Sequence, residues 1–176
     1  MGKLIVLARE HRDAIIVLMT ESIENELDLP DTRRAEALRT IRGGEEVPED
    51  QWDTMAADRD PYVRAAVASR HDCPERSLRQ LINDPVAGVV VCAAGNPSTP
   101  PDALNSAISS KDPNIRLAAC SHPELPMDLV REHYPILGKA ERLAIFRNPK
   151  VSEDIRAKIA EDIPGYLKTF RVNSES

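Results

Sequence analysis

Three arginines share one position of a 26-residue spacing: Arg64, Arg116 and Arg142. Val90 interrupts this column at the intervening step, and Asp60 and Asp112 each precede an arginine by four residues. Because guanidinium groups form strong paired hydrogen bonds with carboxylates, the column predicts ion pairs that connect successive structural units. The alternative is a basic strip for a binding partner, which Arg70 and Arg147 would extend. Structural pairing is the simpler interpretation.

Acidic residues provide a second candidate surface, near the start of the chain. Residues 1–60 contain eight Lys or Arg and fifteen Asp or Glu, whereas residues 61–176 contain fifteen and fourteen. Acidic runs at 21–31 and 45–60 therefore account for the whole-chain net charge of −6. The candidate contacts to a basic partner are Glu45, Glu46, Glu49 and Asp50. A solvated surface that keeps the protein soluble is the simpler explanation.

The three cysteines do not form a metal-binding or redox motif. Their number is odd and no two are spaced as Cys-x-x-Cys, which predicts free thiols in a reducing compartment. Cys92 and Cys120 stand where other units have alanine, so we expect them to pack in the core. Cys73 precedes a repeated proline and is expected to be more exposed.

Histidines do not form a catalytic pattern either. His122 occupies the position of Asn96 and Asn148 at a predicted turn, and His133 stands in an otherwise apolar column, where a partly buried structural histidine is expected. The chain has no glycine-rich phosphate loop, no nucleophile elbow and no histidine pair with metal-ligand spacing. The sequence therefore predicts a protein that is not an enzyme and has no catalytic, cofactor-binding or metal-binding residues.

The elements that must position these residues repeat as well. Four prolines lie 26 residues apart, and Ser152 takes the next position: Pro48, Pro74, Pro100 and Pro126. Apolar columns such as those of Val63 and Val67, or Leu78 and Leu81, have helical spacing. A period of this length is typical of a solenoid, because units too small to bury an apolar face alone must stack. Two short amphipathic helices per unit are expected.

Prolines and polar residues mark the predicted ends of these helices. Asp60-Pro61 and Asp112-Pro113 each place an N-cap acceptor before a proline at the first helical position. Helices are expected to end before three further prolines, at Asn96-Pro97, His122-Pro123 and Asn148-Pro149. The second helix of each unit is predicted to begin at the repeated proline.

These segments carry a family resemblance. The runs Asp60-Pro61-Tyr62-Val63-Arg64 and Asp112-Pro113-Asn114-Ile115-Arg116, with the stretch from Asn96 to Pro100, resemble HEAT-like repeats of the leucine-rich repeat variant type. The similarity covers about residues 36–160. It implies a right-handed α-solenoid used chiefly for binding. Val90 departs from the pattern, and no cysteine cluster is present for the iron–sulfur cofactor that can accompany such repeats, so no cofactor is expected.

The predicted fold is all-α: a right-handed α-solenoid of about five 26-residue, two-helix HEAT-like or leucine-rich repeat variant units. We expect an N-terminal helical cap over 1–35, repeats over 36–163 and a C-terminal tail over 164–176. Charged residues interrupt the first apolar run too early for a membrane span or a signal peptide. A cytoplasmic location is therefore expected.

The primary functional hypothesis is a non-catalytic scaffold or adaptor that binds another protein, with a basic surface on the partner if the acidic residues make the contact. One alternative is an acidic inhibitor that imitates the charge of a nucleic acid. The other is a HEAT-like nucleic-acid-binding protein related to the alkylpurine DNA glycosylases. Phosphate binding needs a basic surface and unpaired bases stack on aromatic rings. The net charge of −6 and the aromatic content of 3% argue against nucleic acid, and no membrane partner is expected.

Overall fold

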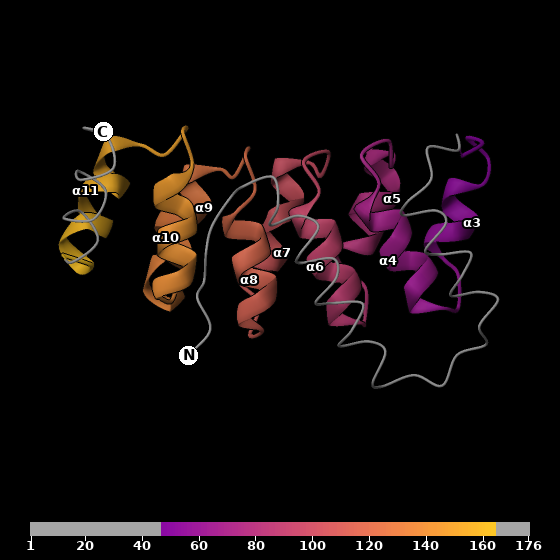
Figure 1. Cartoon of the computed structure of the whole chain (residues 1–176), viewed down its shortest axis with the longest axis horizontal. Helices are drawn as coiled ribbons and strands as arrows, with labels where there is room; N and C mark the ends of the chain where they lie inside the picture. The colour runs from indigo at the N-terminus through magenta and orange to yellow at the C-terminus, as the bar shows by residue number, and fades with distance from the viewer. Residues whose placement is uncertain (1–46, 165–176) are drawn as a thin grey trace, which may run out of the picture.

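The computed structural model describes residues 47–164, and this part of the chain is entirely helical (Figure 1). Between residues 47 and 164 it contains nine α-helices, two 3-10 turns and no strand. The helices are α3 (Trp52–Ala56), α4 (Pro61–Ser69), α5 (Glu75–Leu81), α6 (Ala87–Gly95), α7 (Leu104–Ile108), α8 (Pro113–Cys120), α9 (Met127–His133), α10 (Lys139–Arg147) and α11 (Glu153–Asp162). The 3-10 turns are η1 (Pro101–Ala103) and η2 (Tyr134–Ile136). The prediction of a helical chain is confirmed for these residues.

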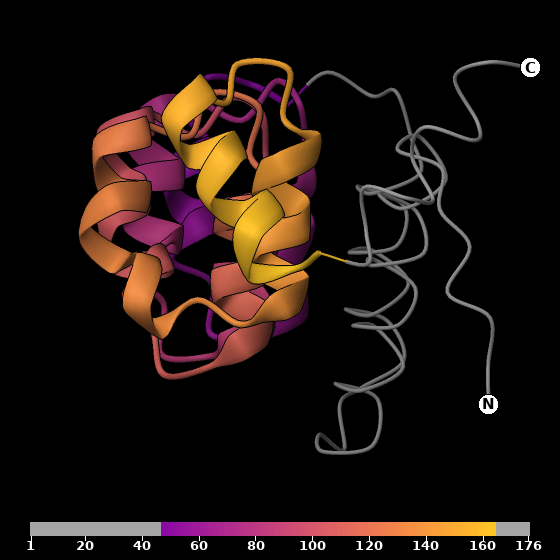
Figure 2. The ribbon, with the colours of Figure 1, turned by 90° about the vertical axis from the view of Figure 1, so that its left-hand side faces the viewer.

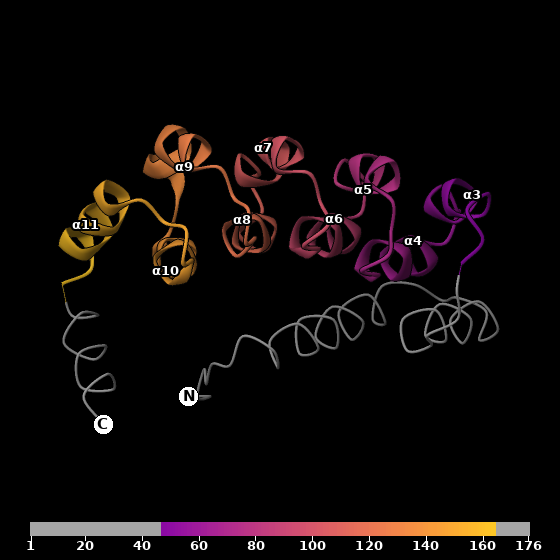
Figure 3. The same ribbon diagram turned by 90° about the horizontal axis from the view of Figure 1, so that it is seen from above.

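Successive helices alternate between two layers (Figure 3). The first layer consists of α4, α6, α8 and α10, and the second of α3, α5, α7, α9 and α11. First-layer helices begin at Pro61, Ala87, Pro113 and Lys139, each 26 residues after the one before. Neighbouring helices of the first layer contact each other, and each also contacts the second layer. Seen along the row, the two layers superpose around a shared core (Figure 2).

The aspartates predicted to begin helices do so. The Asp60 side chain accepts a hydrogen bond of 2.8 Å from the backbone N–H of Tyr62, and Asp112 accepts one of 2.8 Å from Asn114. Pro61 and Pro113 follow at the first helical position, where a missing N–H costs nothing. Each of these two first-layer helices therefore starts at the predicted residue.

The predicted helix ends are confirmed too. Asn96 and Asn148 are the C-caps of α6 and α10, and α8 ends at Cys120, one residue before its C-cap Ser121. The second-layer helices α5 and α9 begin directly after Pro74 and Pro126, as predicted. The helix after Pro100 differs, because it opens with the 3-10 turn η1 before α7.

The core lies between the two layers and is built from the repeated apolar columns. The second-layer column contributes Trp52, Leu78, Leu104 and Val130, each at most 3% exposed. Fully burying one such side chain stabilises the fold by about 1.5–3 kcal/mol. Cys120 is buried as predicted, but Cys73 is also buried, at 3% exposed, so the expectation of an exposed thiol is wrong. It packs with the core cluster beneath the repeated proline.

The last described unit ends the core with a charged side chain. Arg156 takes the next position after Val130 in the apolar column, donates to the Phe146 carbonyl at 3.2 Å and lies 5.1 Å from the centre of the Phe146 ring. Its aliphatic stem can cover apolar surface while the guanidinium stays near water. The predicted N-terminal cap, 1–35, lies outside the described residues, as does most of the predicted tail.

Candidate interaction surface

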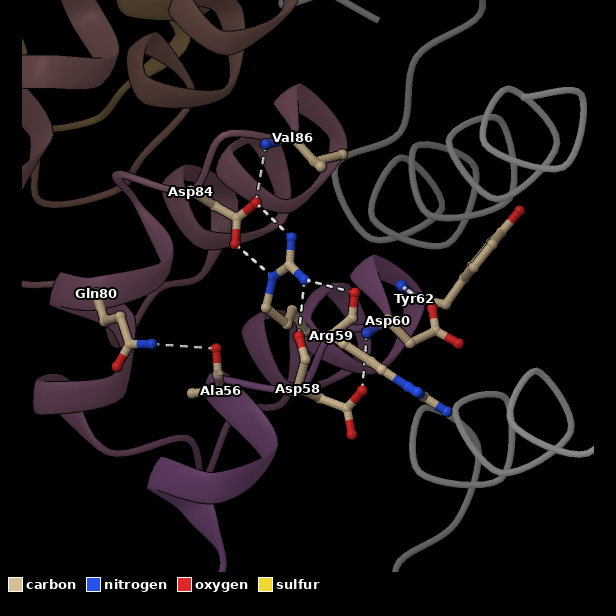
Figure 4. A network of polar contacts seen from close by, with 9 residues as sticks. Ala56, Asp58, Arg59, Asp60, Tyr62, Gln80, Asp84 and Val86 are labelled. Carbon is tan, nitrogen blue, oxygen red and sulfur yellow. Dashed lines mark hydrogen bonds and ion pairs between the residues drawn. The ribbon is translucent and has the colours of Figure 1, made fainter. Parts of the chain in front are cut away.

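The arginine column forms ion pairs between units, and Arg64 shows the pattern most completely (Figure 4). Its guanidinium donates to both carboxylate oxygens of Asp84, at 2.6 and 2.9 Å. It also donates to the carbonyls of Asp58 and Arg59, at 2.7 and 3.3 Å. The bond to Asp84 raises the pKa of Arg64 above its already high ordinary value. The side chain thus ties the start of α4 to the loop that leads into α6.

The equivalent arginines make the same kind of connection. Arg116 pairs with Glu141 at 3.1 Å and donates to the carbonyls of Ser110 and Lys111, at 2.9 and 3.0 Å. Arg142 pairs with Asp162 at 3.0 Å and stacks on Tyr134, 4.4 Å from the ring centre. Structural pairing between units is therefore observed. The carboxylates differ from those expected, because Asp60 and Asp112 are used as helix caps.

Most of this arginine column is not available as a basic strip. The side chains of Arg64, Arg116 and Arg142 are only 12%, 15% and 22% exposed, and each is engaged by carboxylates and carbonyls. Arg70 is similar: its side chain is 11% exposed, pairs with Asp72 at 2.6 Å and lies 5.6 Å from the Trp52 ring centre. Arg147, by contrast, is exposed at the end of α10.

The acidic candidates are only partly within the described residues. Glu49 and Asp50 are exposed, and Glu49 accepts a 2.5 Å contact from Arg76 in the next unit. Glu45 and Glu46 lie outside the described residues. The acidic surface proposed from the sequence stays a prediction.

A row of polar side chains connects the turns that follow the first-layer helices. Asn96 donates to the carbonyls of Ala68 and Arg70, both at 2.7 Å. Asn148 likewise donates to the carbonyls of His122 and Pro123, at 3.1 and 3.3 Å. The sequence indicated only a turn role for these positions. The signal for the connection was their 26-residue spacing beside prolines.

His122 occupies the middle of this row and is completely buried. Its Nε2 lies 3.0 Å from the Asn96 carbonyl and its Nδ1 lies 3.1 Å from the backbone N–H of Glu124. Because that N–H can only donate, Nδ1 accepts and Nε2 carries the proton, which is the neutral ring. Burial lowers the pKa of His122 below its ordinary value. The other predicted structural histidine, His133, is half-buried and contacts Asn105 at 3.1 Å.

The second layer carries its own ion pairs, on its exposed side. Equivalent positions pair Arg76 with Asp53, Arg79 with Asp102 and Arg131 with Asp154, at 2.9, 2.8 and 3.1 Å. The first of these pairs has its charges exchanged relative to the other two. Exposed pairs of this kind are each worth little, about 0–1 kcal/mol.

Charge is distributed unevenly between the layers. The described first-layer helices carry five cations and one anion, a net charge of +4. The second-layer helices, with η1, carry nine anions and five cations, a net charge of −4. The first-layer anion, Glu141, is buried against Arg116. Carboxylates are therefore absent from the exposed positions of the described first-layer helices.

Residues 61–86 match the family model described as leucine rich repeat variant. The matched segment begins with α4, contains α5 and ends directly before α6, so it spans one structural period. The chain contains a leucine rich repeat variant unit. The leucine rich repeat variant resemblance predicted from the sequence is thereby confirmed over this segment. Comparisons with curated proteins and with solved structures each found no match.

The described residues offer little to support chemistry. Between 47 and 164, no three His, Cys, Asp or Glu side chains are grouped so that they could hold a metal ion. Burial raises the pKa of Cys73 and of Cys120 to about 12, so at neutral pH neither is a thiolate nucleophile. None of the helices α3 to α11 is long and apolar enough to cross a membrane.

Proposed function

We propose that the chain is a non-catalytic scaffold or adaptor that binds another protein along a right-handed α-solenoid of about five 26-residue units. Support comes from the leucine rich repeat variant match and from the row of short helices that alternate between two layers. Such rows expose long surfaces that contact partners.

The observation that carries this proposal is the difference in charge between the layers. The described first-layer helices have a net charge of +4 and the second-layer helices −4. Charge on a surface steers association and selects partners of the opposite sign. The first layer is the proposed contact surface, since the ion pairs between second-layer helices are mutual and leave fewer charges for a partner.

The experiment compares matched charge reversals on the two layers of the full chain. The first-layer variant carries Lys139→Glu and Arg147→Glu, and the second-layer variant carries Glu153→Lys and Glu161→Lys. All four positions are exposed, so both variants should keep the wild-type circular dichroism and melting temperature. Partners are captured by crosslinking in cells and identified by mass spectrometry.

We expect the first-layer variant to lose partners that the wild type and the second-layer variant retain. Identical capture by all three folded proteins would contradict a first-layer binding surface.

An acidic inhibitor remains the second candidate, because residues 1–60 hold fifteen acidic and eight basic side chains. In that case, reversing Glu45, Glu46, Glu49 and Asp50 to lysine would abolish capture while the Lys139 and Arg147 reversals would not. The wild-type interaction would also weaken with added salt.

A further inference from the structure

Two leucines of the first layer lie outside the core. Leu117 of α8 and Leu143 of α10 are equivalent, 26 residues apart and half-buried, and neither packs against the core cluster. Each stands two residues from buried side chains of its own helix, Ile115 and Ile145 among them. On a helix, positions two apart point to different sides. The leucines therefore belong to the outer side of the first layer.

The helices that carry these leucines are neighbours. α8 and α10 contact each other directly and lie side by side in the first layer (Figures 1 and 3). With eight and nine residues, each is about 12–14 Å long. Together they offer a surface on which about two turns of a partner helix would fit. We call the outer side of α8 and α10 around the two leucines the Leu117–Leu143 face.

Basic side chains border this face. On α10, Lys139 and Arg147 lie four residues before and after Leu143, which places all three on one side of the helix. Both are exposed, and so is Lys111 in the loop before α8. Neither Lys111 nor Lys139 forms an ion pair through its side chain within residues 47–164.

The nearby carboxylates are already used. Asp112 caps α8 through the N–H of Asn114, at 2.8 Å. Glu141 is buried, 4% exposed, and pairs with Arg116. The exposed charge of the Leu117–Leu143 face is therefore positive, and its exposed centre is apolar.

We propose that the Leu117–Leu143 face binds an acidic amphipathic helix of a partner protein. The partner's apolar side chains would cover the two leucines, and its carboxylates would meet Lys111, Lys139 and Arg147. Recognition of an amphipathic helix by an apolar strip with charged borders is a common mode of peptide binding. This inference rests on the proposed function, and it specifies the partner and the contact residues. A surface of this size predicts a weak, micromolar interaction.

A nucleic acid is the other polyanion that such a face could attract, and the structure favours it less. The three arginines of the repeated column are paired inside the protein, and no exposed aromatic side chain is present on α8 or α10 for stacking bases. Phosphate binding would also have to overcome the whole-chain net charge of −6.

The test measures binding of synthetic peptides to the purified full chain by fluorescence anisotropy. The probe is a helical peptide with leucines on one side and glutamates on the other, and the matched peptide has glutamine in place of every glutamate. Single-stranded and duplex DNA of similar length serve as the nucleic-acid arm. Three variants are compared with the wild type: Lys111→Glu with Lys139→Glu, Leu117→Ser with Leu143→Ser, and the control Lys158→Glu on α11.

The glutamate peptide should bind the wild type at least about tenfold more tightly than the glutamine peptide, with an affinity that falls as salt rises. The lysine reversals and the leucine substitutions should each weaken binding about tenfold, whereas Lys158→Glu should change it less than about twofold. Melting temperatures verify that each variant is folded.

Equal affinity for the glutamate and glutamine peptides would overturn the inference, as would binding unaffected by either pair of substitutions. Tighter binding of DNA than of the peptide would also overturn it. If the peptide fails to bind while cellular partners are still lost on reversal of Lys139 and Arg147, the scaffold proposal stands and only the acidic helix is wrong. Loss of both results would contradict both proposals.

Discussion

At the scale of single residues, His122 shows how one side chain can substitute for another within a repeat. Asn96 and Asn148 donate an amide N–H to a carbonyl of the preceding turn and accept a backbone N–H two residues ahead. The neutral imidazole of His122 does both with its two ring nitrogens. The substitution preserves the connection between units, but it introduces a group that titrates near neutral pH.

The first prediction concerns this titration. Because burial lowers the pKa of folded His122, the neutral ring stabilises the fold fully above the unfolded pKa of about 6.5, and this contribution is lost as pH falls below it. His122→Asn should therefore make the melting temperature less dependent on pH between about 7 and 5. Thermal denaturation of both proteins across that range measures the difference. The same pH dependence in both would show that His122 does not control acid sensitivity.

Single residues also show what the sequence could predict and what it could not. Asp60 and Asp112 were identified as caps because a helix start depends on residues adjacent in the chain. The partner of Arg64 was not, since Asp84 lies 20 residues later and only packing brings the two together. Cys73 was predicted to be exposed from the proline beside it, but packing beneath the turn buries it.

At the scale of helices, the start of α10 departs from the pattern for a physical reason. Gly138 takes the N-cap position that Asp60 and Asp112 hold in other units. A Cβ atom at Gly138 would lie 2.7 Å from Oε2 of Glu141, whose carboxylate is held by Arg116. Glu141 itself stands in the column of Val63, Val89 and Ile115. Glycine at this start therefore leaves room for a buried ion pair between α8 and α10.

The second prediction follows from this arrangement. Gly138→Asp restores the usual N-cap residue, yet it should destabilise the protein by about 1–2 kcal/mol, because the new side chain crowds and repels Glu141. In a Glu141→Val background the same substitution should be neutral or stabilising, since the cap is gained without the clash. Urea denaturation of the wild type, both single variants and the double variant gives the coupling energy. Additive effects would show that Glu141 does not determine the residue at position 138.

At the scale of the whole molecule, stability should depend on contacts between neighbouring units. In the described part, first-layer helices contact the first-layer helices before and after them, and Arg64, Asn96 and Asn148 connect adjacent units in the same way. In such an array stability is approximately a sum of unit and interface contributions. The period was visible in the sequence because every unit must present the same residues to its neighbours. The charge difference between layers was not, because it emerges only when alternate helices are grouped.

The last prediction uses position within the row. Leu104 and Ile159 are both buried, at 0% and 1% exposed, but Leu104 lies in a central unit and Ile159 in the last described helix, α11. An unpaired buried carboxylate costs several kcal/mol, which approaches the stability of an ordinary domain. Leu104→Asp should therefore unfold the protein or lower its melting temperature sharply. Ile159→Asp should mainly release α11, whose interface is with α10.

Hydrogen exchange separates the two outcomes. We expect loss of protection confined to α11 and adjacent parts of α10 in Ile159→Asp, and loss throughout α4 to α10 in Leu104→Asp. Ser106→Asp, an exposed position on the same helix as Leu104, is the matched control and should change stability by less than about 0.5 kcal/mol. Equal, global loss of protection in Leu104→Asp and Ile159→Asp would show that the helices fold as one cooperative body. Nearest-neighbour stacking would then not describe how this chain is held together.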